Sequence, residues 1–112
     1  MITVEALKEY GADTEEALVR CMGNAELYTM LVGESLKDVN YEKLKKAIET
    51  KDYDEAFSAA HALKGVLTNL SLTPLAEPVT EIVDSVRTHE DRDYSGLVAK
   101  MEEELTRLKA LA

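Results

Sequence analysis

Cysteine and basic residues are scarce in this sequence of 112 residues. The single cysteine, Cys21, excludes a disulfide within the chain and a zinc site built from several cysteines. Lysine and arginine number 13 against 22 aspartate and glutamate residues, which gives a formal net charge of −9. Nucleic acids and anionic membranes are bound through a surplus of positive charge. The charge balance therefore argues against both as partners.

Signals for export or membrane insertion are missing as well. The N-terminus has no basic stretch followed by an apolar run, and no segment approaches the roughly 18 apolar residues of a membrane-spanning helix. Together with the acidic charge, this predicts a cytoplasmic protein that does not bind a membrane. With 46% hydrophobic residues, the chain has the size and composition of one folded domain over residues 1–112.

Strand-forming patterns are nearly absent. The aromatic residues are Phe57 and five tyrosines, and no segment alternates apolar and polar residues with a period of two. Helix signals occur instead. Thr3 and Gly11 are suited to begin and end a short helix, and Asp13 followed by Glu16 forms a capping box that opens a second helix, to about residue 22.

Two long segments with apolar residues at helical spacing come next. The first extends from about residue 25 to residue 48, and its stripe includes Leu31 and Val39; a bend near Asn40 is left open. The second begins at a capping box formed by Asp52 and Glu55. Its apolar stripe consists of Ala56, Ala60, Leu63, Leu67 and Leu70.

Two further helical segments complete the chain. Thr73 is suited to be an N-cap, with Pro74 in the first turn, ahead of an apolar stripe that ends at Val86. A polar connection over residues 89–93 separates this segment from the last one, whose stripe extends to Leu111. Short connections favour antiparallel neighbours, so we predict an all-α fold, an antiparallel up-down four-helix bundle with short N-terminal helices.

The second long helix directs His61 away from its apolar stripe. A helix turns by 100° per residue, so the direction of a side chain follows from its position. With Ala56 as the origin, the stripe centres near about 10°, and His61 lies at about 140°. We therefore expect an exposed imidazole.

The predicted surroundings of His61 are unusual for a solvated helix face. Gly65 costs about 1 kcal/mol relative to alanine in mid-helix and leaves bare backbone one turn from the imidazole. Lys64 brings a cation within reach of an anion on the ring. The docking residues expected on this face are Phe57, Ser58, Thr68 and Leu72. Phe57 lies at the border between this face and the apolar stripe. Packing against an adjacent helix is therefore as open an interpretation of Phe57 as docking.

A short motif connects this face to a known family. The sequence from His61 to Gly65 is His-Ala-Leu-Lys-Gly. A histidine followed by leucine, lysine and glycine two, three and four residues later resembles the motif of histidine-phosphotransfer (Hpt) domains. The segment over residues 20–24 also resembles the helix-turn that precedes the bundle in that family, and the similarity covers about residues 12–110. The family usually has glycine ten residues after the histidine, where this sequence has Ser71, and Thr68 stands where glycine or serine is more common.

The resemblance implies a phosphorelay intermediate. By that resemblance His61 accepts a phosphoryl group from the aspartate of one receiver domain and donates it to another, Lys64 helps to neutralise the phosphoryl oxygens, and Gly65 leaves room for the partner. The implied partners are response-regulator receiver domains and a (hybrid) sensor histidine kinase. We expect no cofactor in this chain, and Mg²⁺ is expected in the receiver. Because no nucleotide-binding glycine loop is present, we expect a phosphocarrier without ATP-dependent kinase activity of its own. We also expect a monomer.

Two other functions remain open at this stage. One is the phosphorylatable N-terminal domain of a chemotaxis-type histidine kinase, in which ATP bound to a separate kinase domain is the donor. The other is a helical adaptor that binds receivers without carrying phosphate. The second histidine, His89, lies in the polar connection and is expected to be solvated, while Cys21 is expected to pack as a small apolar residue.

Overall fold

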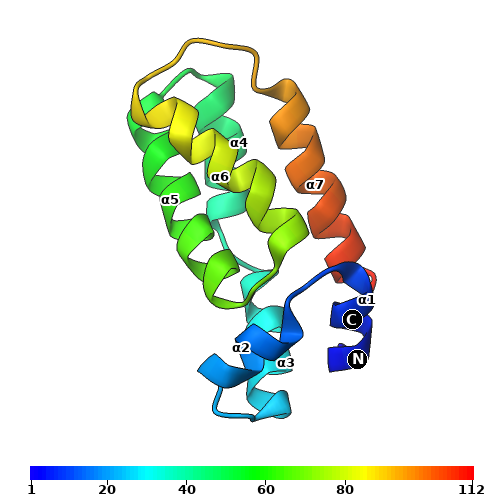
Figure 1. Ribbon diagram of the computed structural model, residues 1–112. Coiled ribbons are helices and arrows are strands. Elements are labelled where there is room, and N and C mark those ends of the chain that lie inside the picture. The colour runs from blue at the N-terminus through cyan, green and yellow to red at the C-terminus, as the bar shows by residue number, and fades with distance from the viewer.

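The computed structural model describes all 112 residues and contains seven helices and no strand. The helices are α1 (Val4–Tyr10), α2 (Thr14–Arg20), α3 (Ala25–Ser35), α4 (Asn40–Glu49), α5 (Tyr53–Asn69), α6 (Thr73–Arg87) and α7 (Ser95–Lys109). Helices α4 to α7 form the antiparallel bundle, and α1, α2 and α3 lie at one end of it (Figure 1). The predicted all-α bundle with short N-terminal helices is confirmed. No helix has both the length and the apolar character required to cross a membrane.

Side-chain caps begin several helices where the sequence predicts them. Thr3, Asp13 and Asp52 each accept a hydrogen bond from the backbone N–H three residues later, at 3.1, 3.2 and 3.1 Å. The start of α6 is different, because Leu72 occupies the N-cap position without a side-chain hydrogen bond and Thr73 is already helical. The predicted cap at Thr73 is therefore wrong by one residue.

The long segment expected from residue 25 to residue 48 is two helices. Helix α3 ends at Ser35 and α4 begins at Asn40, whose backbone N–H donates to Asp38 Oδ1 at 2.8 Å. The connection takes Val39 out of the apolar stripe, and 65% of its surface is exposed. The bend that the sequence left open is thus a complete break.

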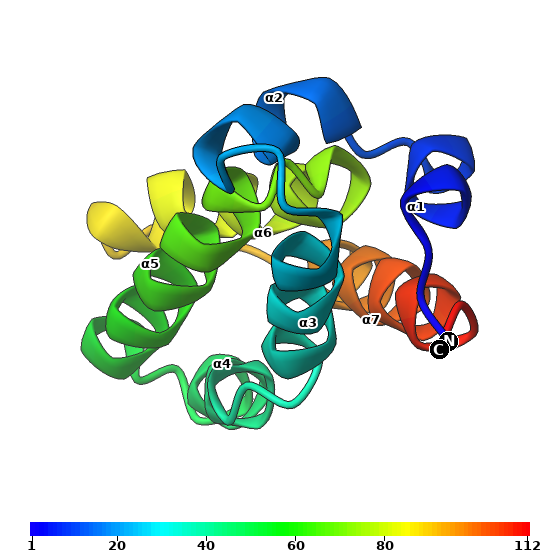
Figure 2. The same cartoon turned by 90° about the horizontal axis from the view of Figure 1, so that it is seen from below.

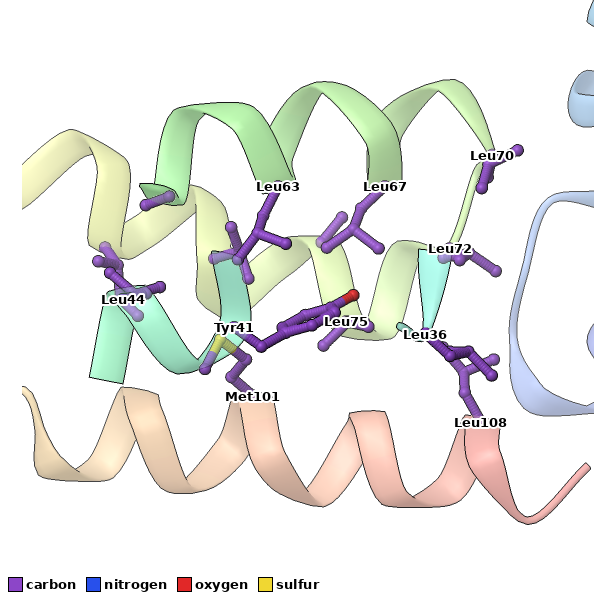
Figure 3. Close-up of a cluster of buried hydrophobic side chains, with 14 of the residues drawn as sticks. Leu36, Tyr41, Leu44, Leu63, Leu67, Leu70, Leu72, Leu75, Met101 and Leu108 are labelled. Carbon is purple, nitrogen blue, oxygen red and sulfur yellow. The ribbon is translucent and has the colours of Figure 1, made fainter. Parts of the chain in front are cut away.

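The core lies between the four bundle helices. Leu63 and Leu67 project into it from α5, opposite Met101 and Leu108 of α7 (Figure 3). The buried cluster also includes side chains from α1, α2 and α3. The apolar stripe of α5 therefore faces inward as predicted, which leaves the opposite side of this helix to solvent.

The N-terminal helices hydrogen-bond the backbone where α5 ends, and Figure 2 shows α2 and α3 beside that end. The carbonyl groups of residues 69, 70 and 71 accept hydrogen bonds from Arg20 Nη1, the Tyr28 hydroxyl and the Asp13 N–H, at 3.0, 2.9 and 3.0 Å. Burial raises the pKa of Tyr28 to about 12, so its hydroxyl keeps the proton that it donates. The last carbonyls of a helix have no partner within it, and leaving them unpaired is costly. Helices α2 and α3 therefore complete the end of α5.

Ser71 turns the chain between α5 and α6. Its φ of 54° lies in the left-handed region, which costs a residue with a side chain about 1–2 kcal/mol. The Ser71 hydroxyl accepts a hydrogen bond from Arg20 at 2.9 Å and donates one to Glu16 at 3.2 Å, and Arg20 and Glu16 form an ion pair. These contacts offset the backbone strain, and the hydrogen bonds from Arg20 and Ser71 lower the pKa of Glu16.

We expect Arg20→Ala to lower the free energy of unfolding by about 1–2 kcal/mol, because the Asn69 carbonyl and the Ser71 hydroxyl lose a charged donor. Urea unfolding followed by circular dichroism measures the change. Lys100→Ala is the matched control, since Lys100 pairs only with Glu103 at 3.7 Å on the exposed face of α7 and its loss should cost less than about 0.5 kcal/mol. Equal losses in the two variants would contradict the capping role of Arg20.

Candidate functional site

The outer face of α5 carries most of the predicted site residues. His61, Ser58 and Thr68 are exposed, and Phe57 and Lys64 are half-buried. The predicted exposure of the imidazole is confirmed. This arrangement follows from the helical period, because the stripe that fills the core leaves positions 58, 61, 65 and 68 on the opposite side.

The His61 ring lies against the ring of Phe57, one turn earlier on α5. The ring centroids are 5.4 Å apart and the planes are inclined by 13°, so the two rings are stacked. No hydrogen bond or ion pair joins His61 to another residue of the chain, whereas the ring of His89 contacts Asp54 Oδ1 at 2.8 Å. The nitrogen atoms of His61 are therefore open to an external partner.

Gly65 leaves open space one turn after His61. A Cβ atom at this position would meet no atom of the rest of the chain within 4 Å. Close packing against a neighbouring helix thus does not explain the glycine. Gly33 in α3 has equally open surroundings, so what distinguishes Gly65 is its place beside the imidazole.

Lys64 and Thr68 continue the same face. Lys64 is a half-buried cation three residues after His61, a spacing at which helical side chains are neighbours. The Thr68 hydroxyl donates to the Lys64 carbonyl at 2.7 Å and lies 3.3 Å from the Gly65 carbonyl. The Thr68 hydroxyl is therefore hydrogen-bonded within its own helix. The family that the motif resembles more often has glycine or serine at this position.

Leu72 does not belong to this exposed face. Its expected place there requires the helical direction of α5 to continue to residue 72, but α5 ends at Asn69 and Ser71 reverses the chain. Leu72 is fully buried and points into the core (Figure 3). The expectation that Leu72 is a docking residue is wrong, because a side chain without exposed surface cannot contact a partner.

Arg87 is a neighbour of the site that sequence reasoning missed. It is the last residue of α6, and its guanidinium carbon lies over the Phe57 ring, 5.6 Å from the centroid. Helices α5 and α6 form an antiparallel hairpin that turns at Ser71 and Leu72, so residues about equally distant from the turn come together. That symmetry is the sequence signal that could have found the contact.

Sequence reasoning also missed an apolar groove on the other side of α5. It has a volume of about 360 Å³ between α3 and α5, and Leu31, Val66 and Leu70 contribute its apolar lining. Leu31 was expected in the core stripe of its helix, but 37% of its surface is exposed. That expectation is wrong, because α3 buries only the side that carries Tyr28 and Val32.

The surface between α5 and α6 is negatively charged. A groove of about 430 Å³ extends from Thr68 along α6 to the start of α2. Its acidic lining residues are Asp13, Glu16, Glu77, Glu81 and Asp84. No three histidine, cysteine, aspartate or glutamate side chains of the chain are grouped as ligands for a metal ion.

Comparison with protein families matches residues 26–111 to the Hpt domain. The chain belongs to the Hpt domain family. Membership confirms the resemblance carried by residues 61–65 and assigns the chain a phosphotransfer role in two-component signalling, in which Hpt domains interact with receiver domains and kinases. The matched residues comprise α4 to α7 and nearly all of α3, while α1 and α2 lie outside them. Comparisons with curated proteins and with solved structures give no match.

Two residues outside the face behave as the sequence predicts. His89 is exposed in the connection between α6 and α7, and Cys21 is buried as a free thiol. In this Hpt domain His89 is therefore a suitable control for experiments on His61.

We expect Gly65→Gln to keep or slightly raise the helix content, because glutamine is the better helix former by up to about 1 kcal/mol. The same variant should slow phosphoryl transfer about tenfold or more, since its side chain rises into the open space beside His61. Circular dichroism and transfer of radiolabelled phosphate measure the two effects. Gly33→Gln is the matched control, with the same change in a helix away from His61. Unchanged transfer in Gly65→Gln would refute the access role of Gly65.

Proposed function

We propose that this Hpt domain is a phosphorelay intermediate that carries a phosphoryl group on His61 between aspartates of receiver domains. The observation that carries the proposal is the exposed His61 ring, free of hydrogen bonds, beside the open backbone of Gly65. A receiver presents its phosphoryl group on an aspartate, so the acceptor has to be reachable by a folded protein. Exposure and the absence of a side chain at Gly65 supply that access.

The chemistry requires one bond to form as another breaks. A deprotonated nitrogen of His61 attacks the phosphorus of the aspartyl phosphate, the new N–P bond forms, and the P–O bond to the carboxylate breaks. The aspartate leaves as a carboxylate, and the same steps in reverse load the next receiver. Such transfers depend mainly on position and on neutralisation of charge.

We assign that neutralisation to Lys64 and to the partner. The ammonium of Lys64, three residues after His61, is suited to contact the phosphoryl oxygens. The Mg²⁺ ion and the remaining charged groups belong to the receiver in this proposal. In this proposal the exposed residues Ser58 and Thr68 contact the partner, which is a receiver domain or a sensor kinase that carries one.

The direct test is to incubate the protein with a receiver domain that carries radiolabelled phosphate on its aspartate. We expect acid-labile, base-stable label on the wild type and on His89→Gln, and none on His61→Gln, because only His61 is an exposed acceptor beside Lys64 and Gly65. Gel autoradiography after acid and base treatment measures the label.

The same experiment separates the alternatives. Label that appears only with ATP and a separate kinase domain assigns the chain to a chemotaxis-type kinase. Binding of a receiver by both wild type and His61→Gln, without label on either, identifies an adaptor. Label that persists in His61→Gln contradicts the proposed acceptor.

We expect Lys64→Ala to slow transfer about tenfold or to shorten the lifetime of the phosphohistidine, because one cation near the phosphoryl oxygens is lost. Stability should change by less than about 0.5 kcal/mol, since Lys64 has no ion pair within the chain. Lys100→Ala removes the same charge from α7 and serves as the control. A large loss of stability in Lys64→Ala would identify a structural role.

A further inference from the structure

The stack of His61 on Phe57 restricts the direction in which the imidazole lone pair points. The planes are inclined by only 13° at a centroid distance of 5.4 Å. The lone pair of an imidazole nitrogen lies in the plane of its ring. In this arrangement the lone pair of the unprotonated His61 nitrogen is therefore directed along the face of Phe57 and not into it, and the imidazole that carries it is exposed.

Phe57 is itself held by two parts of the fold. Its ring is half-buried against the hydrophobic core, and the Arg87 guanidinium lies over it from the end of α6. His61 has no corresponding restraint of its own, because it forms no hydrogen bond within the chain. An exposed histidine without contacts changes its ring orientation freely, since its χ2 angle has only broad preferences and surface side chains reorient within nanoseconds. The orientation of the His61 imidazole thus depends on its stacking contact with the Phe57 ring.

We propose that Phe57 is a positioning residue for phosphoryl transfer, whose ring holds the His61 imidazole with a nitrogen lone pair directed toward the incoming phosphorus. The proposal rests on the function proposed above. In-line transfer from a docked receiver requires the nucleophile to meet a phosphorus atom in a fixed position, so a ring held in one orientation reacts more often than a rotating one. This role differs from that of a docking residue, which would strengthen binding and leave the transfer step unchanged.

The test compares two phosphoryl donors on Phe57→Leu, which retains an apolar side chain and removes the aromatic face. The first donor is a receiver domain phosphorylated with acetyl phosphate and Mg²⁺, which presents phosphorus in a fixed geometry. The second is phosphoramidate, a small molecule that approaches the imidazole from any open direction. Phe57→Tyr, which keeps the ring, is the matched control, and Phe57→Met replaces Phe57→Leu if that variant does not fold.

A positioning role predicts that kcat for the receiver falls about tenfold in Phe57→Leu relative to the phosphoramidate rate, with KM for the receiver unchanged. Phe57→Tyr should restore kcat. A rise in KM with unchanged kcat overturns the proposal and makes Phe57 a docking residue. An equal fall with both donors also overturns it, because the ring would then affect the reactivity of the imidazole and not its orientation.

Nuclear magnetic resonance adds a readout that needs no phosphate. The ring protons of His61 should be shifted upfield by the Phe57 ring in the wild type and in Phe57→Tyr, and the shift should disappear in Phe57→Leu. Equal shifts in all three proteins overturn the stack in solution. Failure of the proposed function appears differently, as wild-type protein that takes no label on His61 from the phosphorylated receiver.

Discussion

The carbonyl groups at the C-terminal end of α5 have to be hydrogen-bonded, and much of the structure follows from how this is done. The carbonyl groups of residues 69, 70 and 71 accept hydrogen bonds from Arg20, Tyr28 and Asp13, which belong to the N-terminal part of the chain. These hydrogen bonds stabilise the C-terminal end of α5 and offset the cost of the left-handed backbone conformation at Ser71. The helix that carries His61 is thereby fixed at one end by α2 and α3 and along its length by the core. Helix α2 lies outside the residues matched to the Hpt family, and Arg20 hydrogen-bonds from it to the end of the matched helix α5.

A rigid helix with a solvent-facing histidine suits a carrier of phosphate. The imidazole forms no hydrogen bond within the chain, so no internal contact has to break before a partner reaches it. Restraint comes instead from a stacked ring, which limits orientation and leaves both nitrogen atoms open. Gly65 leaves open space one turn after His61, and Lys64, three residues after it, supplies a positive charge. The face thus combines open access to the imidazole with a stacking contact that limits the orientation of its ring.

The helices and the exposed face of α5 could be predicted from the sequence because the interactions that form a helix join residues close together in the chain. Capping residues at Thr3, Asp13 and Asp52 act over three residues, and the stripe of α5 repeats every three or four. The outward direction of His61 follows from that period alone. The same reasoning failed at Leu72, where the period was extended beyond the last residue of the helix, and at Leu31, whose exposure depends on how α3 packs.

The sequence by itself determined the helical class, the four long amphipathic segments with a break left open, and the exposed motif from His61 to Gly65, since each rests on contacts within one or two turns. Only the tertiary structure decided what holds and surrounds that motif. The bonds that Arg20 and Tyr28 form to the end of α5 span 49 and 42 residues, and Arg87 reaches Phe57 only because α6 folds back along α5. Such partners are chosen by how the helices pack in three dimensions, and no periodicity within a single helix specifies them.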